Sequence, residues 1–198
     1  MKFALATANA GKIREITGIL SGTDAEIVTR KDLGIDIEIE ETGSTFYENA
    51  LLKARAICEA SGLPSIADDS GLMADALDGA PGVYSSSFGG AGLSDGERCA
   101  YLVNSLRDKE HRGAKFVCTI VCAFPDGRII SARGECAGRI IDTPRGSNGF
   151  GYDPVFLVDG SDRTMAELSS AEKNLISHRG KALMKFAALL PPETGIKF

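Results

Sequence analysis

The stretch AKFVCTIVCAFPDGRIISAR, residues 114–133, decides the fold class of this 198-residue chain. Its first part, Ala114–Phe124, is a long apolar run that is typical of a buried strand. The turn sequence Pro125–Gly127 follows, and a second strand candidate, Arg128–Arg133, comes directly after it. This order predicts an antiparallel hairpin in the middle of the chain.

Strands and helices alternate on both sides of this hairpin. The predicted strands outside it are Lys2–Ala6, Ile35–Ile39, Ser65–Asp68, Gly138–Ile141 and Val155–Val158. Two predicted helices begin at Lys12 and His178. Four others begin at capping boxes, whose residue pairs are Thr45/Glu48, Ser94/Glu97, Thr164/Glu167 and Ser169/Glu172. The pattern predicts an α/β fold with a mixed β-sheet, because the hairpin disfavours a purely parallel, doubly wound sheet.

Composition narrows the functional classes. The chain carries 22 Lys and Arg against 27 Asp and Glu, a net charge of −5, so we expect no general nucleic-acid binding. The first residues lack the apolar core of a signal peptide, and no stretch reaches transmembrane length. The five cysteines are odd in number and form no C-x-x-C motif. These features predict a cytoplasmic protein with no membrane partner.

The first candidate site is the segment between the first strand and the first helix. It consists of Thr7, Ala8, Asn9, Ala10, Gly11 and Lys12. Backbone N–H groups at a helix start attract phosphate oxygens, and a lysine in the first turn adds positive charge. The alternative is an ordinary turn between strand and helix with a solvated lysine.

Two acidic pairs form the second candidate. Glu40-Glu41 and Asp68-Asp69 each lie at the end of a predicted strand. Such carboxylates can hold Mg²⁺, and one beside the metal can accept a proton from water. The alternative is turn chemistry, because Asp-Asp-Ser-Gly is also a good turn sequence.

The third and fourth candidate sites are suited to binding a flat heterocycle. Phe150 and Tyr152 lie in a glycine-rich loop, where a base could stack on them. His178 and Arg179 offer donors that could read the O6 edge of a purine. The alternatives are a surface loop anchored by two rings and a helix start capped by Ser177.

Seven segments in register resemble the inosine triphosphate pyrophosphatase family, the RdgB-type dITP/XTP pyrophosphatases. They are Thr7-x-Asn9-x-x-Lys12, Glu40-Glu41-Thr42-Gly43, Asn49-Ala50-x-x-Lys53-Ala54, Ala67-Asp68-Asp69-Ser70-Gly71-Leu72, Ala80-Pro81-Gly82-Val83-Tyr84-Ser85, Gly149-Phe150-Gly151-Tyr152-Asp153-Pro154, and Glu172-Lys173-Asn174 through Ser177-His178-Arg179-Gly180. The resemblance implies one domain over residues 1–198, with an elongated mixed sheet and two lobes around a central substrate cleft. It implies hydrolysis of ITP, dITP and XTP to the monophosphate and pyrophosphate, with Mg²⁺ and as a homodimer, and so a role in cleansing the nucleotide pool.

The resemblance also implies roles for individual residues. Asp69 would be the general base, and Glu40 and Asp69 would hold the metal, with Glu41 and Asp68 as second choices. The substrate would contact Thr7, Ala8, Asn9, Ala10, Gly11, Lys12, Lys53, Ser70, Phe150, Gly151, Tyr152, Asp153, Lys173, His178 and Arg179. Of these, Thr7–Lys12 and Lys53 would bind the triphosphate, and Phe150–Asp153, Lys173, His178 and Arg179 would form the base pocket.

The chain departs from the family pattern at three positions. Ala8 and Asn148 stand where glycine is frequent, and Ser87 stands where arginine is usual. Two other functions stay open on the sequence: a related pyrophosphatase for another modified base, and a non-catalytic sensor of purine triphosphates. A plain structural domain leaves the clustering of these motifs without a reason.

Overall fold

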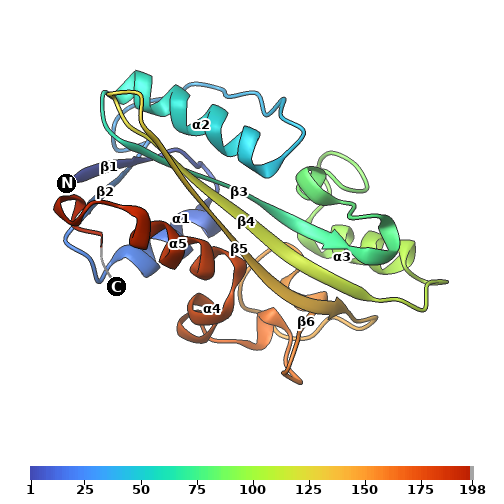
Figure 1. The fold of residues 1–198 in the computed structure, drawn as a ribbon. Helices are drawn as coiled ribbons and strands as arrows, with labels where there is room; N and C mark the ends of the chain where they lie inside the picture. Colours follow the sequence, from blue (N-terminus) through green and yellow to red (C-terminus); the bar gives the residue numbers. More distant parts are fainter. Residues whose placement is uncertain (197–198) are drawn as a thin grey trace. The chain divides into compact units, whose positions relative to one another are not determined.

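A computed structural model describes residues 1–196, in which six strands form one sheet in the order β2-β1-β3-β4-β5-β6 (Figure 1). The strands are β1 (Lys2–Leu5), β2 (Glu26–Thr29), β3 (Ser65–Ala74), β4 (Gly113–Ala123), β5 (Ile129–Ile140) and β6 (Phe156–Val158). β1 runs parallel to β2 and β3, whereas β6 runs antiparallel to β5. The predicted α/β fold with a mixed sheet is confirmed.

The α-helices of the described residues are α1 (Ala10–Leu20), α2 (Phe46–Ser61), α3 (Asp95–Ser105), α4 (Ser170–Ile176) and α5 (His178–Leu189). Short 3-10 helices are η1 (Asp75–Leu77), η2 (Gly82–Tyr84), η3 (Asp153–Val155), η4 (Met165–Glu167) and η5 (Pro192–Thr194). The four predicted capping boxes form, and those of Thr45, Ser94 and Ser169 have reciprocal side-chain and backbone hydrogen bonds. At η4, Thr164 N–H donates to Glu167 Oε2 at 2.7 Å. Gly62 caps the C-terminus of α2 in the left-handed conformation, with a φ of +67°.

The central hairpin forms as predicted. Gly127 N–H donates to Phe124 O in the turn between β4 and β5, and Gly127 has a φ of +88°. The predicted strands Arg128–Arg133 and Gly138–Ile141 are parts of a single strand, β5, which is 12 residues long. The hairpin is therefore longer than its sequence pattern indicates.

The predicted strand Ile35–Ile39 is wrong. Residues 35–43 form no regular structure, and the strand between α1 and α2 is β2, which the sequence analysis did not predict. Ile35 and Ile39 are partly buried against the core, but Ile37 is 37% exposed, so the alternation does not produce a strand face. The turn that was the alternative interpretation of Asp68-Asp69-Ser70-Gly71 is absent, because β3 continues through these residues to Ala74.

The chain divides into two compact units. Unit 1 comprises Met1–Asp69, Cys118–Gly134 and Arg179–Phe198, and unit 2 comprises Ser70–Val117 and Glu135–His178. β3, β4 and β5 each contribute residues to both units.

Unit 1 has a core on each face of its strands. Phe3 and Leu5 pack with α1 and α5, whereas the intervening Ala4 and the following Ala6 pack with α2. This alternation follows the two-residue period of a strand. Figure 1 shows α2 across the strands from α1 and α5.

Unit 2 has a core of its own between α3 and its strands. Leu102 of α3 packs in one cluster with Leu72 of β3, Phe116 of β4, Ile140 of β5 and Phe156 of β6. In residues 1–196, none of the helices combines the length and the apolar character needed to cross a membrane.

Candidate functional site

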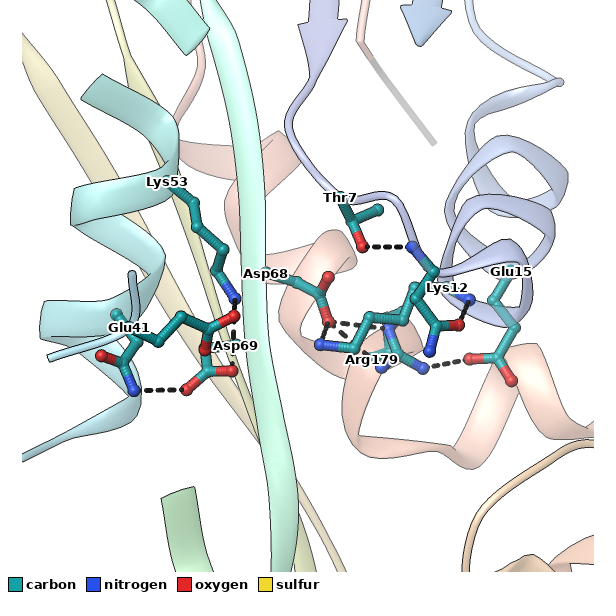
Figure 2. Close-up of polar contacts among 10 residues, drawn as sticks. Thr7, Lys12, Glu15, Glu41, Lys53, Asp68, Asp69 and Arg179 are labelled. Atoms are coloured by element: carbon teal, nitrogen blue, oxygen red, sulfur yellow. Dashed lines mark hydrogen bonds and ion pairs between the residues drawn. The ribbon is translucent and has the colours of Figure 1, made fainter. Parts of the chain in front are cut away.

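The site in unit 1 is built around two consecutive carboxylates of β3, Asp68 and Asp69. Ile66 belongs to the core beside α1 and α5, and Ala67 belongs to the core beside α2. By the same alternation Asp68 points toward α1 and α5, and Asp69 points toward α2 (Figure 2). The two carboxylates therefore lie on opposite sides of one strand.

Asp68 is fully buried, with an exposed fraction of 0%, and it binds two cations. Its Oδ2 atom lies 3.1 Å from Lys12 Nζ and 3.1 Å from Arg179 Nη2. Arg179 also contacts Glu15 of α1. Burial alone would raise the pKa of Asp68, but the positive charges of Lys12 and Arg179 outweigh it and hold that pKa below its ordinary range.

The segment before α1 is ordered by local hydrogen bonds. Asn9 is the N-cap residue, and its Oδ1 atom accepts from Lys12 N–H at 3.1 Å. Asn9 N–H donates in turn to Thr7 Oγ1 at 3.2 Å. Thr7 is buried, whereas Ala8, Asn9 and Ala10 are exposed, so the N-terminal amides of an 11-residue helix face an accessible surface.

Asp69 lies on the α2 side and is 5% exposed. Its carboxylate accepts from Asn49 Nδ2 at 3.4 Å and from Lys53 Nζ at 3.3 Å. Asn49 and Lys53 are four residues apart on α2, which places both on the same helix face. Burial raises the pKa of Asp69 above its ordinary value, although Lys53 and Lys12 oppose this, and Glu41 and Asp68 add to it.

Lys53 joins a second carboxylate to Asp69. Its Nζ atom lies 3.1 Å from Glu41 Oε1, and the exposed Glu41 lies in the segment 35–43 that has no regular structure. Gly43 N–H donates to Asn49 Oδ1 at 2.8 Å, and a Cβ atom at Gly43 would lie 2.6 Å from that oxygen. Glycine at position 43 therefore lets this segment approach α2 closely enough for Glu41 to reach Lys53.

The pKa of Lys53 is raised above its ordinary value. Burial alone would lower it, but the carboxylates of Asp69, Asp68 and Glu41 outweigh the burial. The lysine is therefore a stable cation between Glu41 and Asp69 at neutral pH.

The two carboxylates that bind Lys53 are also suitable ligands for a hard divalent cation. The carboxylates of Asp69 and Glu41 both accept from the Lys53 ammonium, whereas Glu40 makes no such contact among the described residues. The structure therefore brings the second-choice ligand Glu41, rather than the first-choice Glu40, to Asp69. In residues 1–196, no group of three or more His, Cys, Asp and Glu side chains could hold a metal ion. Mg²⁺ is often held by one or two carboxylates with substrate phosphates, and two carboxylates fit that chemistry.

A second polar cluster lies in unit 2, around Asp153 and Lys173. Their carboxylate and ammonium are 2.5 Å apart, and both side chains are buried. Asp153 also accepts from Phe150 N–H at 3.0 Å, and Lys173 Nζ lies 5.1 Å from the centre of the half-buried Phe150 ring. Gly149 has a φ of +77°, and a Cβ atom there would lie 2.0 Å from Asp153 Oδ2, so the loop requires glycine at this point.

Aromatic stacking orients His178 in the same unit. The imidazole ring lies parallel to Phe116 of β4, with 4.8 Å between ring centres and 14° between planes. The side chain of His178 is buried. Phe116 was not among the predicted site residues, because an apolar residue in a strand carries no sign of a site.

Other predicted residues differ in what they can offer a ligand. Tyr152 is 4% exposed and donates its hydroxyl to Ser85 O at 2.8 Å, so its ring belongs to the core of unit 2. Arg179 is 1% exposed and binds Asp68 and Glu15 in unit 1, while Lys173 and His178 belong to unit 2. Ser70 is half-buried and directly follows Asp69.

Sequence reasoning also missed two polar residues of unit 1. Asn49 was seen only as part of a motif, although its four-residue spacing from Lys53 predicts a shared helix face. Glu15 lies three residues after Lys12 on α1, a spacing that indicates proximity but not the pairing with Arg179.

Comparisons with known proteins identify the family of this chain. The Ham1 family model matches residues 3–189. The chain is 50% identical to the dITP/XTP pyrophosphatase of Deinococcus deserti over 95% of this chain and 90% of the relative. It is 48% identical to the dITP/XTP pyrophosphatase of Nostoc sp. over 94% of this chain and 91% of the relative. The structure of the Staphylococcus aureus Ham1 protein superposes with a TM-score of 0.87, at 41% identity and over 98% of this chain and all of that one. The match of nearly the whole chain confirms the family resemblance, and the chain belongs to the Ham1 family.

Proposed function

We propose that this protein hydrolyses the non-standard purine nucleoside triphosphates ITP, dITP and XTP to the monophosphate and pyrophosphate, and so cleanses the nucleotide pool. The observation that carries the proposal is the buried Asp69 carboxylate, held by Lys53 and Asn49 beside the carboxylate of Glu41. The names of the relatives from Deinococcus deserti and Nostoc sp. support the substrate class.

Asp69 is the proposed general base. Its carboxylate takes a proton from a water molecule, whose oxygen attacks phosphorus in the α–β phosphoanhydride; the bond to the bridging oxygen breaks and pyrophosphate leaves. Burial raises the pKa of Asp69, which makes the carboxylate a stronger base. Lys53 and Asn49 keep it in place through their two hydrogen bonds.

The triphosphate meets positive charge in unit 1. Lys12 and Lys53 supply ammonium groups, and the amides at the start of α1 supply N–H donors. Thr7–Gly11 line the same helix start. This local charge accounts for binding of an anionic substrate by a chain whose net charge is −5. Arg179, held by Asp68 and Glu15, would keep Asp68 and therefore Lys12 in position.

Mg²⁺ is the proposed cofactor. Asp69 would hold it together with Glu41 or Glu40, and the pairing of Glu41 with Lys53 supports the former. When bound, the ion neutralises phosphate charge and acts as a Lewis acid.

Unit 2 supplies the proposed base recognition. Phe150 offers a ring face, and Lys173 and His178 offer donors suited to a 6-oxo group. Asp153 orients Lys173 and the amide of Phe150, and Gly151 and Ser70 complete the proposed substrate contacts. Tyr152, predicted as a contact, would instead support the loop, because its ring lies in the core of unit 2. Adenine presents an amino group at this position, which would leave a protein donor unpaired, so ATP is rejected.

The proposal extends to a cytoplasmic homodimer. Five buried free thiols suit a reducing compartment, and the family resemblance supports the dimer. Light scattering of the purified protein measures the oligomeric state, and a monomer at all concentrations would overturn that part.

The test is release of pyrophosphate from ITP, dITP, XTP, GTP, ATP and a modified pyrimidine triphosphate, each with Mg²⁺ and again with EDTA. We expect Mg²⁺-dependent release from the first three, far above that from ATP and GTP. Release from another nucleotide alone would replace the substrate class. Binding of ITP with no release from any of them would indicate a sensor.

A further inference from the structure

Two side chains of α3 bind both polar backbone groups of Gly151, a residue of the glycine-rich loop in unit 2. Gly151 N–H donates to Asp95 Oδ2 at 2.7 Å. Gly151 O accepts from Cys99 Sγ at 3.3 Å. Asp95 and Cys99 are four residues apart on α3, so they present two side chains from successive turns of one helix face.

The two tethers differ in strength. The Asp95 carboxylate is charged and its hydrogen bond is short, which is the stronger kind. The Cys99 thiol is a weak donor. Burial, with the nearby Asp95 and Asp153 carboxylates, raises the pKa of Cys99 to about 11, so the thiol keeps the proton that it donates.

The loop depends on external tethers because its own backbone is permissive. Gly149 and Gly151 both have positive φ values, of +77° and +63°. Glycine loses more conformational freedom on ordering than any other residue. Asp153 orders one end of the loop through Phe150 N–H and Lys173. Gly151, between Phe150 and Tyr152, is ordered from α3.

α3 also binds the segment that follows η2. Arg98, next to Cys99, is buried and donates to Ser86 O at 3.1 Å and to Leu93 O at 3.0 Å. α3 is therefore anchored to the loop that follows η2 and provides a fixed support for Asp95.

We infer that Asp95 is a positioning residue for base recognition: its carboxylate fixes Gly151 and thereby the ring of Phe150. This inference rests on the proposed function, because it assigns the loop to the nucleobase. No motif in the sequence draws attention to Asp95, and it is exposed rather than buried.

The test compares Asp95→Ala with Asp95→Asn. Both remove the negative charge from the first turn of α3, so any effect on the helix dipole is shared. Only the asparagine keeps an oxygen that can accept from Gly151 N–H. The difference between the two variants therefore isolates the hydrogen bond.

The first readout is amide hydrogen exchange at Gly151 by NMR, which needs no substrate. We expect exchange to be about tenfold faster in Asp95→Ala than in the natural protein, and about equal to it in Asp95→Asn. Equal exchange in all three proteins would overturn the inference even if the proposed function fails.

The second readout is steady-state kinetics with dITP. We expect Asp95→Ala to raise KM about tenfold with kcat changed by less than about twofold, and Asp95→Asn to restore KM. Loss of kcat with unchanged KM, or identical kinetics of the two variants, would overturn the inference. Absence of turnover in the natural protein would instead contradict the proposed function, and the exchange readout would then decide alone.

Discussion

Asp68 and Asp69 are consecutive in β3, yet their carboxylates bind cations from different helices (Figure 2). Asp68 pairs with Lys12 of α1 and Arg179 of α5, and Asp69 pairs with Lys53 of α2. The acidic pair is thus not one site with two ligands. Asp68 serves the ion network beside α1, and only Asp69 joins the carboxylate of Glu41 at Lys53.

Replacement of Asp69 separates chemistry from folding. Asp69→Asn keeps the shape of the side chain but removes the base, so we expect turnover to fall by at least about 10²-fold. The melting temperature should change little, because Lys53 keeps the carboxylate of Glu41 as a counter-charge. Pyrophosphate release and thermal melting measure the two effects. Activity close to that of the natural protein would exclude Asp69 as the base.

Replacement of Asp68 should lower the stability of the fold, which replacement of Asp69 should leave nearly unchanged. Asp68→Asn leaves Arg179 and Lys12 without their buried counter-charge, and loss of one partner of a buried ion pair costs about 3–5 kcal/mol. Denaturant unfolding should show a lower midpoint. An unfolding free energy within about 1 kcal/mol of that of Asp69→Asn would contradict the different roles given to the two residues.

The same residue makes stability depend on pH. The pKa of Asp68 lies below its ordinary value of 3.8 in the folded protein, so in acid the unfolded chain takes up its proton first. The stabilisation is complete above the unfolded pKa and is lost as pH falls toward the folded pKa. Unfolding free energy measured below pH about 4 should therefore fall less steeply in Asp68→Asn than in the natural protein. Parallel curves would show that another group carries the acid sensitivity.

Two positions on α2 offer a matched comparison of charge. Lys53 bridges Glu41 and Asp69, whereas Arg55 is exposed on the same helix. Lys53→Gln should lower kcat/KM by about 10²–10³-fold, because it removes a preorganised positive group beside the reacting phosphates. Arg55→Gln, which removes the same charge elsewhere, should leave kcat/KM within about twofold. Equal losses would indicate a general effect of net charge.

The metal ligand can be assigned by a second matched pair. Glu41→Gln should raise the Mg²⁺ concentration needed for half-maximal activity by about tenfold or more, because one carboxylate ligand is lost. Glu40→Gln should leave this concentration unchanged, since Glu41 and not Glu40 contacts Lys53 beside Asp69. Titration of each variant with Mg²⁺ measures the requirement, and the reverse outcome would return the role to Glu40.

Local features of the fold could be predicted well. The capping boxes at Thr45 and Ser94 depend on residues three apart, so their hydrogen bonds form without help from the rest of the chain. The prediction of a strand at 35–39 was wrong because strand formation depends on distant parts of the chain. Its alternating pattern is local, but a strand needs a partner, and β2 takes the place beside β1.

The sequence by itself determined the chemical groups available to this protein: the lysine at the start of the first helix, the carboxylates of Asp68 and Asp69, and the aromatic residues of the glycine-rich loop. These follow from residue types and short spacings. The tertiary structure alone decided the partners, bringing Arg179 to Asp68 across 111 positions of the chain and Asp95 to Gly151 across 56. The physical reason is that charge pairing depends on which faces of strands and helices pack together, and that packing is a property of the whole chain.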